Sequence, residues 1–176
     1  GHRRISYITA PTDRSSLRDR MAGFLRGTVE AELPVRDDSV VRLEGSASCG
    51  DAGASAMSRT LDRLLAQPEP PTAIFTSHDS LALEAMSLLQ ARGLRVPKDL
   101  SVVGYDGTEA GEVCAVPLTT IKQDFHEMAR MAGRILLERF DGRADPLRYH
   151  LMIRPQLISR ASCAAPAQSV CATAAV

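Results

Sequence analysis

Short runs rich in β-branched residues alternate along this chain with longer stretches in which apolar residues recur at helical spacing. The expected strands cover 5–9, 40–44, 72–76, 100–104, 118–121 and 148–153, and the expected helices cover about 13–33, 52–66, 79–92 and 125–140. Because helices occupy the connections between strands, the pattern predicts an α/β fold. We expect a parallel sheet with helices on both faces.

Length and charge exclude several classes of protein. With 176 residues, of which 44% are hydrophobic, the chain is long enough for one domain with its own core. Its 21 basic and 21 acidic residues give a formal net charge of zero. Because domains that bind DNA carry an excess of basic residues, we do not expect this segment to bind DNA by itself. No run of 18 apolar residues occurs, so we expect no membrane span. The chain begins without Met inside a hydrophobic pattern, which is typical of a piece of a longer protein.

The cysteines give information about the redox environment of the protein but do not point to a metal or redox site. They stand at positions 49, 114, 163 and 171, and none belongs to a Cys-x-x-Cys pair. That pattern favours a reducing cytoplasm over a disulfide framework.

The carboxyl ends of parallel strands share one edge of a sheet, and ligands of open α/β sheets bind there. The residues that this sequence places at that edge are Arg14, Arg18, Arg20, Asp51, Ser77, His78, Asp79, Tyr105, Asp106, Gln123 and Asp124. Carboxylates accept hydroxyl protons, and guanidinium groups donate to oxygens. The set therefore suits a small polyhydroxylated ligand.

The same residues also have plain structural interpretations. Asp79 is placed to cap the helix that starts there, and Asp106 to cap a turn. Arg20, on a helix, is placed to form a surface ion pair with Asp13 or Glu30. The residues alone leave both sets of interpretations open.

Catalysis has little support in the sequence. Ser77, His78 and Asp79 are the residue types of a hydrolytic triad, but adjacent side chains leave a strand end in different directions and cannot form the required relay. His78 is then either a hydrogen-bonded structural residue or a ligand contact. The four histidines lack metal-ligand spacing, and no Gly-x-Ser-x-Gly elbow occurs. We expect a binding protein without catalytic residue, metal or cofactor.

The helix expected at 79–92 is apolar on two sides. One side carries Ala82, Ala85, Met86 and Leu89, and another carries Leu81 and Leu88. A helix of this kind is buried on more than one side, so it is either central or in contact with a partner chain.

Five segments resemble, in order and spacing, motifs of the lactose/galactose repressor family of bacterial transcription regulators. They are RDRMAGF at 18–24, PTAIF followed by His78 and Asp79 at 71–79, DLSVVGYDGT at 99–108, VPLTTIKQDF at 116–125 and PQLISRAS at 155–162. Together they extend the resemblance over residues 1–162.

The resemblance implies one lobe of a two-lobed effector domain like that of periplasmic sugar-binding proteins. In such proteins a ligand in the cleft between the lobes favours closure, which changes the angle of an attached DNA-binding head. Residues 1–162 match the C-terminal lobe, and residues 124–153 correspond to the part that crosses to the N-terminal lobe. The helix-turn-helix head has no counterpart here, so operator DNA would be bound only through a segment outside this chain.

Position by position, the resemblance also implies an effector site. It consists of Arg20, Ala52, His78, Asp79, Asp106 and Gln123. Two of these depart from the family pattern. Ala52 stands where the family has an aromatic wall and cannot stack on a sugar. His78 is bulkier than the family's Asn and could titrate near neutral pH.

Dimerisation is the second implied property. Leu83 matches the family's dimer face, and with Leu81 and Leu88 it forms the expected homodimer interface. Residues 163–176 lack leucine heptads, so we expect a disordered tail rather than a tetramerising coiled coil. The sequence thus predicts a cytoplasmic, effector-sensing and dimerising part of a transcription regulator, a repressor by family. The alternative is a stand-alone dimerisation module that senses no ligand.

Overall fold

The computed structural model describes residues 1–10, 14–44, 51–142 and 151–166, with the side chains of 51–55 excepted. One six-stranded sheet has the order β2-β1-β3-β4-β5-β6. Its strands are β1 (Ile5–Thr9), β2 (Val40–Arg42), β3 (Ala73–Thr76), β4 (Ser101–Asp106), β5 (Thr119–Lys122) and β6 (Gln156–Ile158). The first five pair in parallel, and β6 pairs antiparallel to β5. The predicted fold class is confirmed.

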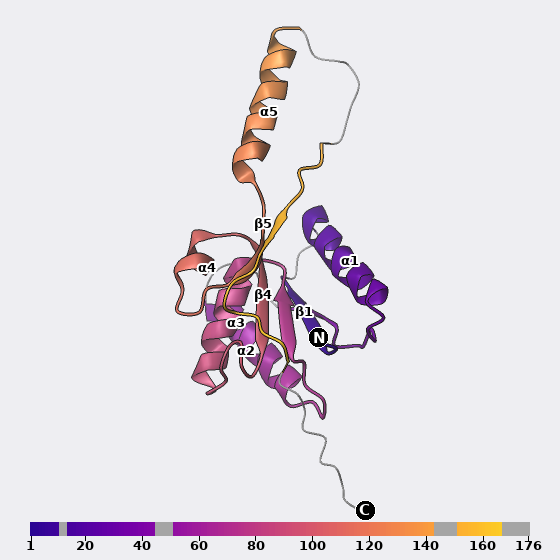
Figure 1. The fold of residues 1–176 in the computed structure, drawn as a ribbon, viewed down its shortest axis with the longest axis vertical. Helices are drawn as coiled ribbons and strands as arrows, with labels where there is room; N and C mark the ends of the chain where they lie inside the picture. The colour runs from indigo at the N-terminus through magenta and orange to yellow at the C-terminus, as the bar shows by residue number, and fades with distance from the viewer. Residues whose placement is uncertain (11–13, 45–50, 143–150, 167–176) are drawn as a thin grey trace, which may run out of the picture.

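Helices cover the two faces of the sheet unequally (Figure 1). They are α1 (Ser15–Glu30), α2 (Asp51–Leu65), α3 (Asp79–Ala91), the short α4 (Glu109–Val113) and α5 (Phe125–Phe140). The main core lies between the sheet and the layer formed by α2 and α3. Its almost fully buried side chains include Ile8, Ile74, Val102, Met57, Leu61 and Leu89.

The opposite face of the sheet meets α1 through an aromatic cluster. Successive side chains of a strand point to opposite faces, so Tyr7 and Phe75 lie on the other side from the main core. Phe24 of α1 stacks on Tyr7 with 5.2 Å between ring centroids, and it meets Phe75 edge-on at 6.2 Å. These ring contacts hold α1 against β1 and β3.

Most predicted elements are confirmed with small shifts at their ends, but the last strand was predicted wrongly. Residues 151–153 of the expected strand are not in the sheet, and residues 148–150 lie outside the described part of the chain. The strand is instead β6, which pairs with β5 through Leu157 opposite Ile121. Met152 is 93% exposed, and residues 151–153 pair with no strand of the described sheet. The short helix α4 was not predicted.

The first residues of the predicted tail are bound to the sheet. The Cys163 thiol donates to the Val102 carbonyl, and the Ala164 N–H donates to the Ser101 hydroxyl. The His2 ring also bonds the Ala164 carbonyl at 2.8 Å. Residues 167–176 lie outside the described part of the chain.

Helix α5 stands away from the sheet (Figure 1). Asp124 caps its first turn by accepting a hydrogen bond from the Glu127 N–H. None of its residues is buried, and its exposed apolar side chains are Phe125, Met128, Leu136, Leu137 and Phe140. An amphipathic helix whose apolar side faces water lacks a packing partner within the described chain. No helix in the described ranges is long and apolar enough to cross a bilayer.

Candidate effector site

Three of the predicted site residues meet at the carboxyl edge of the sheet. Asp106 ends β4, Arg20 reaches it from α1, and Gln123 follows β5 directly. An Arg20 guanidinium nitrogen lies 3.0 Å from Asp106 Oδ1, and the Gln123 side-chain amide donates to the same oxygen at 2.8 Å. The structure therefore brings Arg20, Asp106 and Gln123 together at this edge, as the sequence predicted. The alternative pairing of Arg20 with Glu30 is wrong, because Glu30 pairs with Arg26, and Asp13 lies outside the described residues.

Arg20 is held on two further sides. Its guanidinium carbon lies 3.8 Å from the centre of the Tyr105 ring, and one of its nitrogens donates to the Ser77 carbonyl. The Arg20 and Asp106 side chains are 15% and 24% exposed. A guanidinium and a carboxylate fixed together and still reached by solvent offer both donors and an acceptor to a ligand.

The backbone at Asp106 is unusual for a residue with a side chain. Its φ is 118° and that of the following Gly107 is 76°. Such conformations are costly outside glycine and cluster at ligand-binding sites. The carboxylate faces Arg20 and Gln123, so Asp106 is not the simple turn cap that one interpretation of the sequence suggested.

Asp79 lies beneath this edge and does not face it. Its side chain is fully buried. One carboxylate oxygen accepts from the Thr108 N–H at 2.7 Å and from the Thr108 hydroxyl at 2.9 Å, and the other accepts from the Thr120 hydroxyl at 2.6 Å. The capping interpretation is wrong, because His78 occupies the cap position and Asp79 is the first helical residue. Asp79 ties α3 to β5 and to the loop that follows Asp106.

His78 lies beside the cluster. A ring nitrogen shares a 2.7 Å hydrogen bond with the Ser77 hydroxyl. Burial lowers the pKa of His78 below 6.5, and this effect outweighs the nearby Asp106 carboxylate, which raises it. The shift is away from neutral pH and favours the uncharged ring.

We expect stability to fall as pH drops through about 6.5, because the unfolded chain then binds a proton at His78 that the folded chain resists. The His78 contribution is fully present above that pH and declines until the folded pKa is reached. Urea unfolding at about pH 7.5 and about pH 5.5 measures it. The variant His78→Asn should lose less stability on acidification than the wild type, and His126→Asn on exposed α5 is the matched control. An unchanged pH dependence in His78→Asn would contradict the assignment.

The remaining predicted site residue is Ala52. Helix α2 includes it, but its side chain lies outside the described residues. Tyr105 is a residue that the motif-based site omitted, although its position after the fourth strand was noticed. Its role depends on stacking with Arg20, a contact between α1 and β4 that no local pattern reveals.

A hollow of about 1010 Å³ extends from the cluster along the face of the sheet that α1 covers only in part. Arg20, Tyr105 and Gln123 line one end of it, and Phe24, Phe75 and Val103 line its apolar floor. Groups of histidine, cysteine and acidic side chains able to hold a metal are not found among the described residues.

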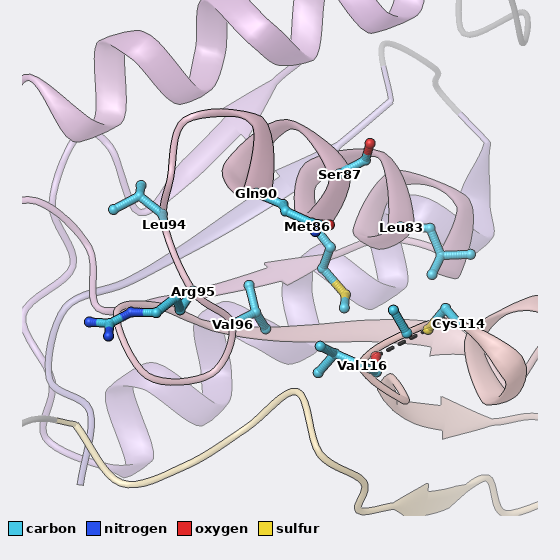
Figure 2. A pocket seen from close by; sticks show the side chains of 10 residues that line it. Leu83, Met86, Ser87, Gln90, Leu94, Arg95, Val96, Cys114 and Val116 are labelled. Atoms are coloured by element: carbon cyan, nitrogen blue, oxygen red, sulfur yellow. Dashed lines mark hydrogen bonds between the residues drawn. The ribbon is translucent and has the colours of Figure 1, made fainter.

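A second, mostly apolar hollow lies on the outer side of α3 (Figure 2). It has a volume of about 340 Å³, and its lining includes Leu83, Met86, Val96, Cys114 and Val116. Of the three leucines predicted for a dimer interface, only Leu83 lines it. All three leucines are partly buried and pack against the core.

Comparison with known proteins places these features in context. Residues 1–163 match a family model described as a periplasmic binding protein-like domain. The chain is 36% identical over 160 residues to the HTH-type transcriptional repressor PurR of Vibrio cholerae serotype O1 (strain M66-2). The aligned region covers 91% of this chain and 45% of that protein. The chain thus spans about half the length of the curated relatives it matches.

Solved structures of transcription regulators have the same fold as this chain. A complex of the transcriptional regulator CelR with cellobiose is similar, with a TM-score of 0.78 at 33% identity, over 92% of this chain and 47% of that one. The lac repressor dimer bound to operator and the anti-inducer ONPF is also similar, with a TM-score of 0.76 at 31% identity, over 93% of this chain and 53% of that one.

Proposed function

Because the chain belongs to the lactose/galactose repressor family and folds as its periplasmic binding protein-like domain, we propose that it is the effector-sensing and dimerising part of a bacterial transcription regulator, a repressor acting in the cytoplasm. The observation that carries this proposal is the cluster of Arg20, Asp106 and Gln123 at the carboxyl edge of the sheet. Operator binding then resides in a helix-turn-helix segment that this chain does not include.

The proposed effector is a small sugar or a related polar metabolite. Hydroxyl groups both donate and accept, so they can donate to Asp106 and accept from Arg20 at once. The CelR structure, named as a complex with cellobiose, supports a sugar as the first candidate. Among the described residues of the site, the Ser77 hydroxyl meets the His78 ring, but Asp79 bonds Thr108 and Thr120 and does not orient that ring as a hydrolase would need. This supports binding without turnover.

The effector site is half of a cleft in this proposal. We assign residues 124–153 to the segment that crosses to the other lobe, as the family resemblance implies. The exposed apolar side of α5 supports this assignment, because a row of apolar side chains is stable only when another surface covers it. Ligand binding between lobes then shifts the population toward the closed state through contacts that exist only in that state.

A screen for ligand-induced stabilisation tests the proposal. The probes are D-glucose, D-galactose, D-ribose and cellobiose, each added to the full-length natural protein. A ligand that binds only the folded state raises the melting temperature in a concentration-dependent way. Stable dimerisation with no response to any probe would instead favour the alternative, a dimerisation module without ligand sensing.

The hollow on α3 supports a homodimer in which Leu83 is central. Replacing Leu83 by Asp places a charge in an apolar interface, so we expect the dimer to shift to monomer by at least tenfold in dissociation constant, or about 1.4 kcal/mol. Sedimentation velocity measures the shift. Val29→Asp, on the exposed part of α1, makes the same change away from the hollow and should leave the dimer intact. An unaltered sedimentation profile for Leu83→Asp would show that this face of α3 is not part of the dimer interface.

A further inference from the structure

The Arg20 guanidinium contacts three groups of different kinds. One of its terminal nitrogens lies 3.0 Å from Asp106 Oδ1, and the other donates to the Ser77 carbonyl. The third group is the Tyr105 ring, whose centre lies 3.8 Å from the guanidinium carbon. At this distance the flat guanidinium lies against the ring face, because an edge-on approach would put a nitrogen between its carbon and the ring and hold the carbon farther away.

The contact with Tyr105 uses a part of Arg20 that does not bind ligands. The N–H groups of a guanidinium ion point outward from its edge, and its face carries no donor. A hydroxyl group that donates to Asp106 and accepts from Arg20 competes with the direct contact between these two residues. The same hydroxyl group does not compete with the ring. The Tyr105 contact is therefore the one that can persist when a ligand is bound.

Both ends of this stack are fixed by the fold. Strand β4 lies between β3 and β5, and Tyr105 stands opposite Ile121 in the ladder. The Tyr105 side chain lines the same end of the large hollow as Arg20. On α1, Phe24 lies one helical turn after Arg20 and stacks on Tyr7, which holds that part of the helix against the sheet. The backbone positions of Arg20 and Tyr105 are thus set by contacts that do not involve the guanidinium.

We propose that Tyr105 is a positioning residue of the effector site, whose ring holds the Arg20 guanidinium in the plane from which its N–H groups bind the ligand. This inference rests on the proposed effector function and adds to it a residue that raises affinity without touching the ligand. An arginine side chain has many rotamers, and a ligand that has to immobilise them binds more weakly. A guanidinium that is already stacked on a ring loses less freedom when the ligand arrives.

Tyr105→Leu and Tyr105→Phe separate the ring from the hydroxyl. Leucine removes the aromatic face, so the variant should bind the tightest of the four probes named above about tenfold more weakly. Phenylalanine keeps the face, so its affinity should stay within about twofold of the wild type. Calorimetric titration of the full-length natural protein measures both. Tyr105→Met, which fills the space with a flexible side chain and no ring, repeats the test if the leucine variant does not fold.

A double-mutant cycle shows whether Tyr105 acts through Arg20. In an Arg20→Ala background no guanidinium remains to be positioned, so Tyr105→Leu should change the affinity by less than about twofold. A side chain that only supports the strand would weaken binding equally in both backgrounds.

Three results would overturn the inference while the effector function stands. They are a wild-type affinity for Tyr105→Leu, an equal loss for Tyr105→Phe and Tyr105→Leu, and a loss from Tyr105→Leu that is undiminished in the Arg20→Ala background. If no probe binds the wild type, the effector function itself fails.

Discussion

Replacing Asp79 by alanine should lower the free energy of unfolding by about 3–5 kcal/mol, and urea denaturation followed by circular dichroism measures the loss. The buried carboxylate accepts three hydrogen bonds, two from Thr108 and one from Thr120. Alanine leaves all three donors without their acceptor, and the Thr120 hydroxyl is then unpaired where water does not reach, since Thr120 is fully buried. Thr108 is exposed, so its two donors can turn to water. Bonds to a charged group contribute more than neutral ones, and their donors are costly to leave unpaired.

The control for this prediction is Asp37→Ala. Asp37 is an exposed acidic residue in a turn, so its loss should change stability by no more than about 0.5 kcal/mol. A loss of less than about 1 kcal/mol for Asp79→Ala would show that the buried network does not hold α3, β5 and the loop after β4 together.

We expect Gly104→Ala to be nearly as damaging, with a loss of about 3 kcal/mol. A Cβ atom on Gly104 would overlap Asp79 Oδ1 and lie 2.9 Å from Leu118 Cδ2, and both of these side chains are fully buried. The added methyl group therefore needs either a shift of β4 or displacement of the Asp79 carboxylate from Thr120. Thermal unfolding measured by calorimetry reports the change.

Gly23→Ala is its matched control. Gly23 lies within α1 with open space around the position of its missing Cβ, so alanine should stabilise the helix by about 0.5–1 kcal/mol. Equal melting temperatures for Gly104→Ala and the wild type would contradict the close packing of β4 on α3.

The sheet and the positions of its polar residues could be predicted because they follow from short-range patterns. Runs of β-branched residues and helical spacing mark the first five strands and the main helices. Once the strands are parallel, their carboxyl ends must share an edge, which is why Asp106 and Gln123 meet there.

Other features depend on contacts between distant segments and could not be predicted. Asp79 has the sequence context of a helix cap, and only the folded chain brings Thr108 and Thr120 to its carboxylate. The last strand was misplaced because a short local pattern does not say which segment finds a partner strand.

The central claim is that Arg20 and Asp106 bind a small polar effector. Calorimetric titration of the natural protein and its Arg20→Ala variant, with the probe that best stabilises the wild type, tests it most directly. The account predicts that Arg20→Ala weakens ligand binding at least tenfold, because it removes a charged donor worth about 1.5–3 kcal/mol, while operator binding without ligand persists. Arg63→Ala, the same change at an exposed position of α2 away from this hollow, should leave the affinity unchanged. Equal affinities for the wild type and Arg20→Ala would contradict the assignment of the effector site.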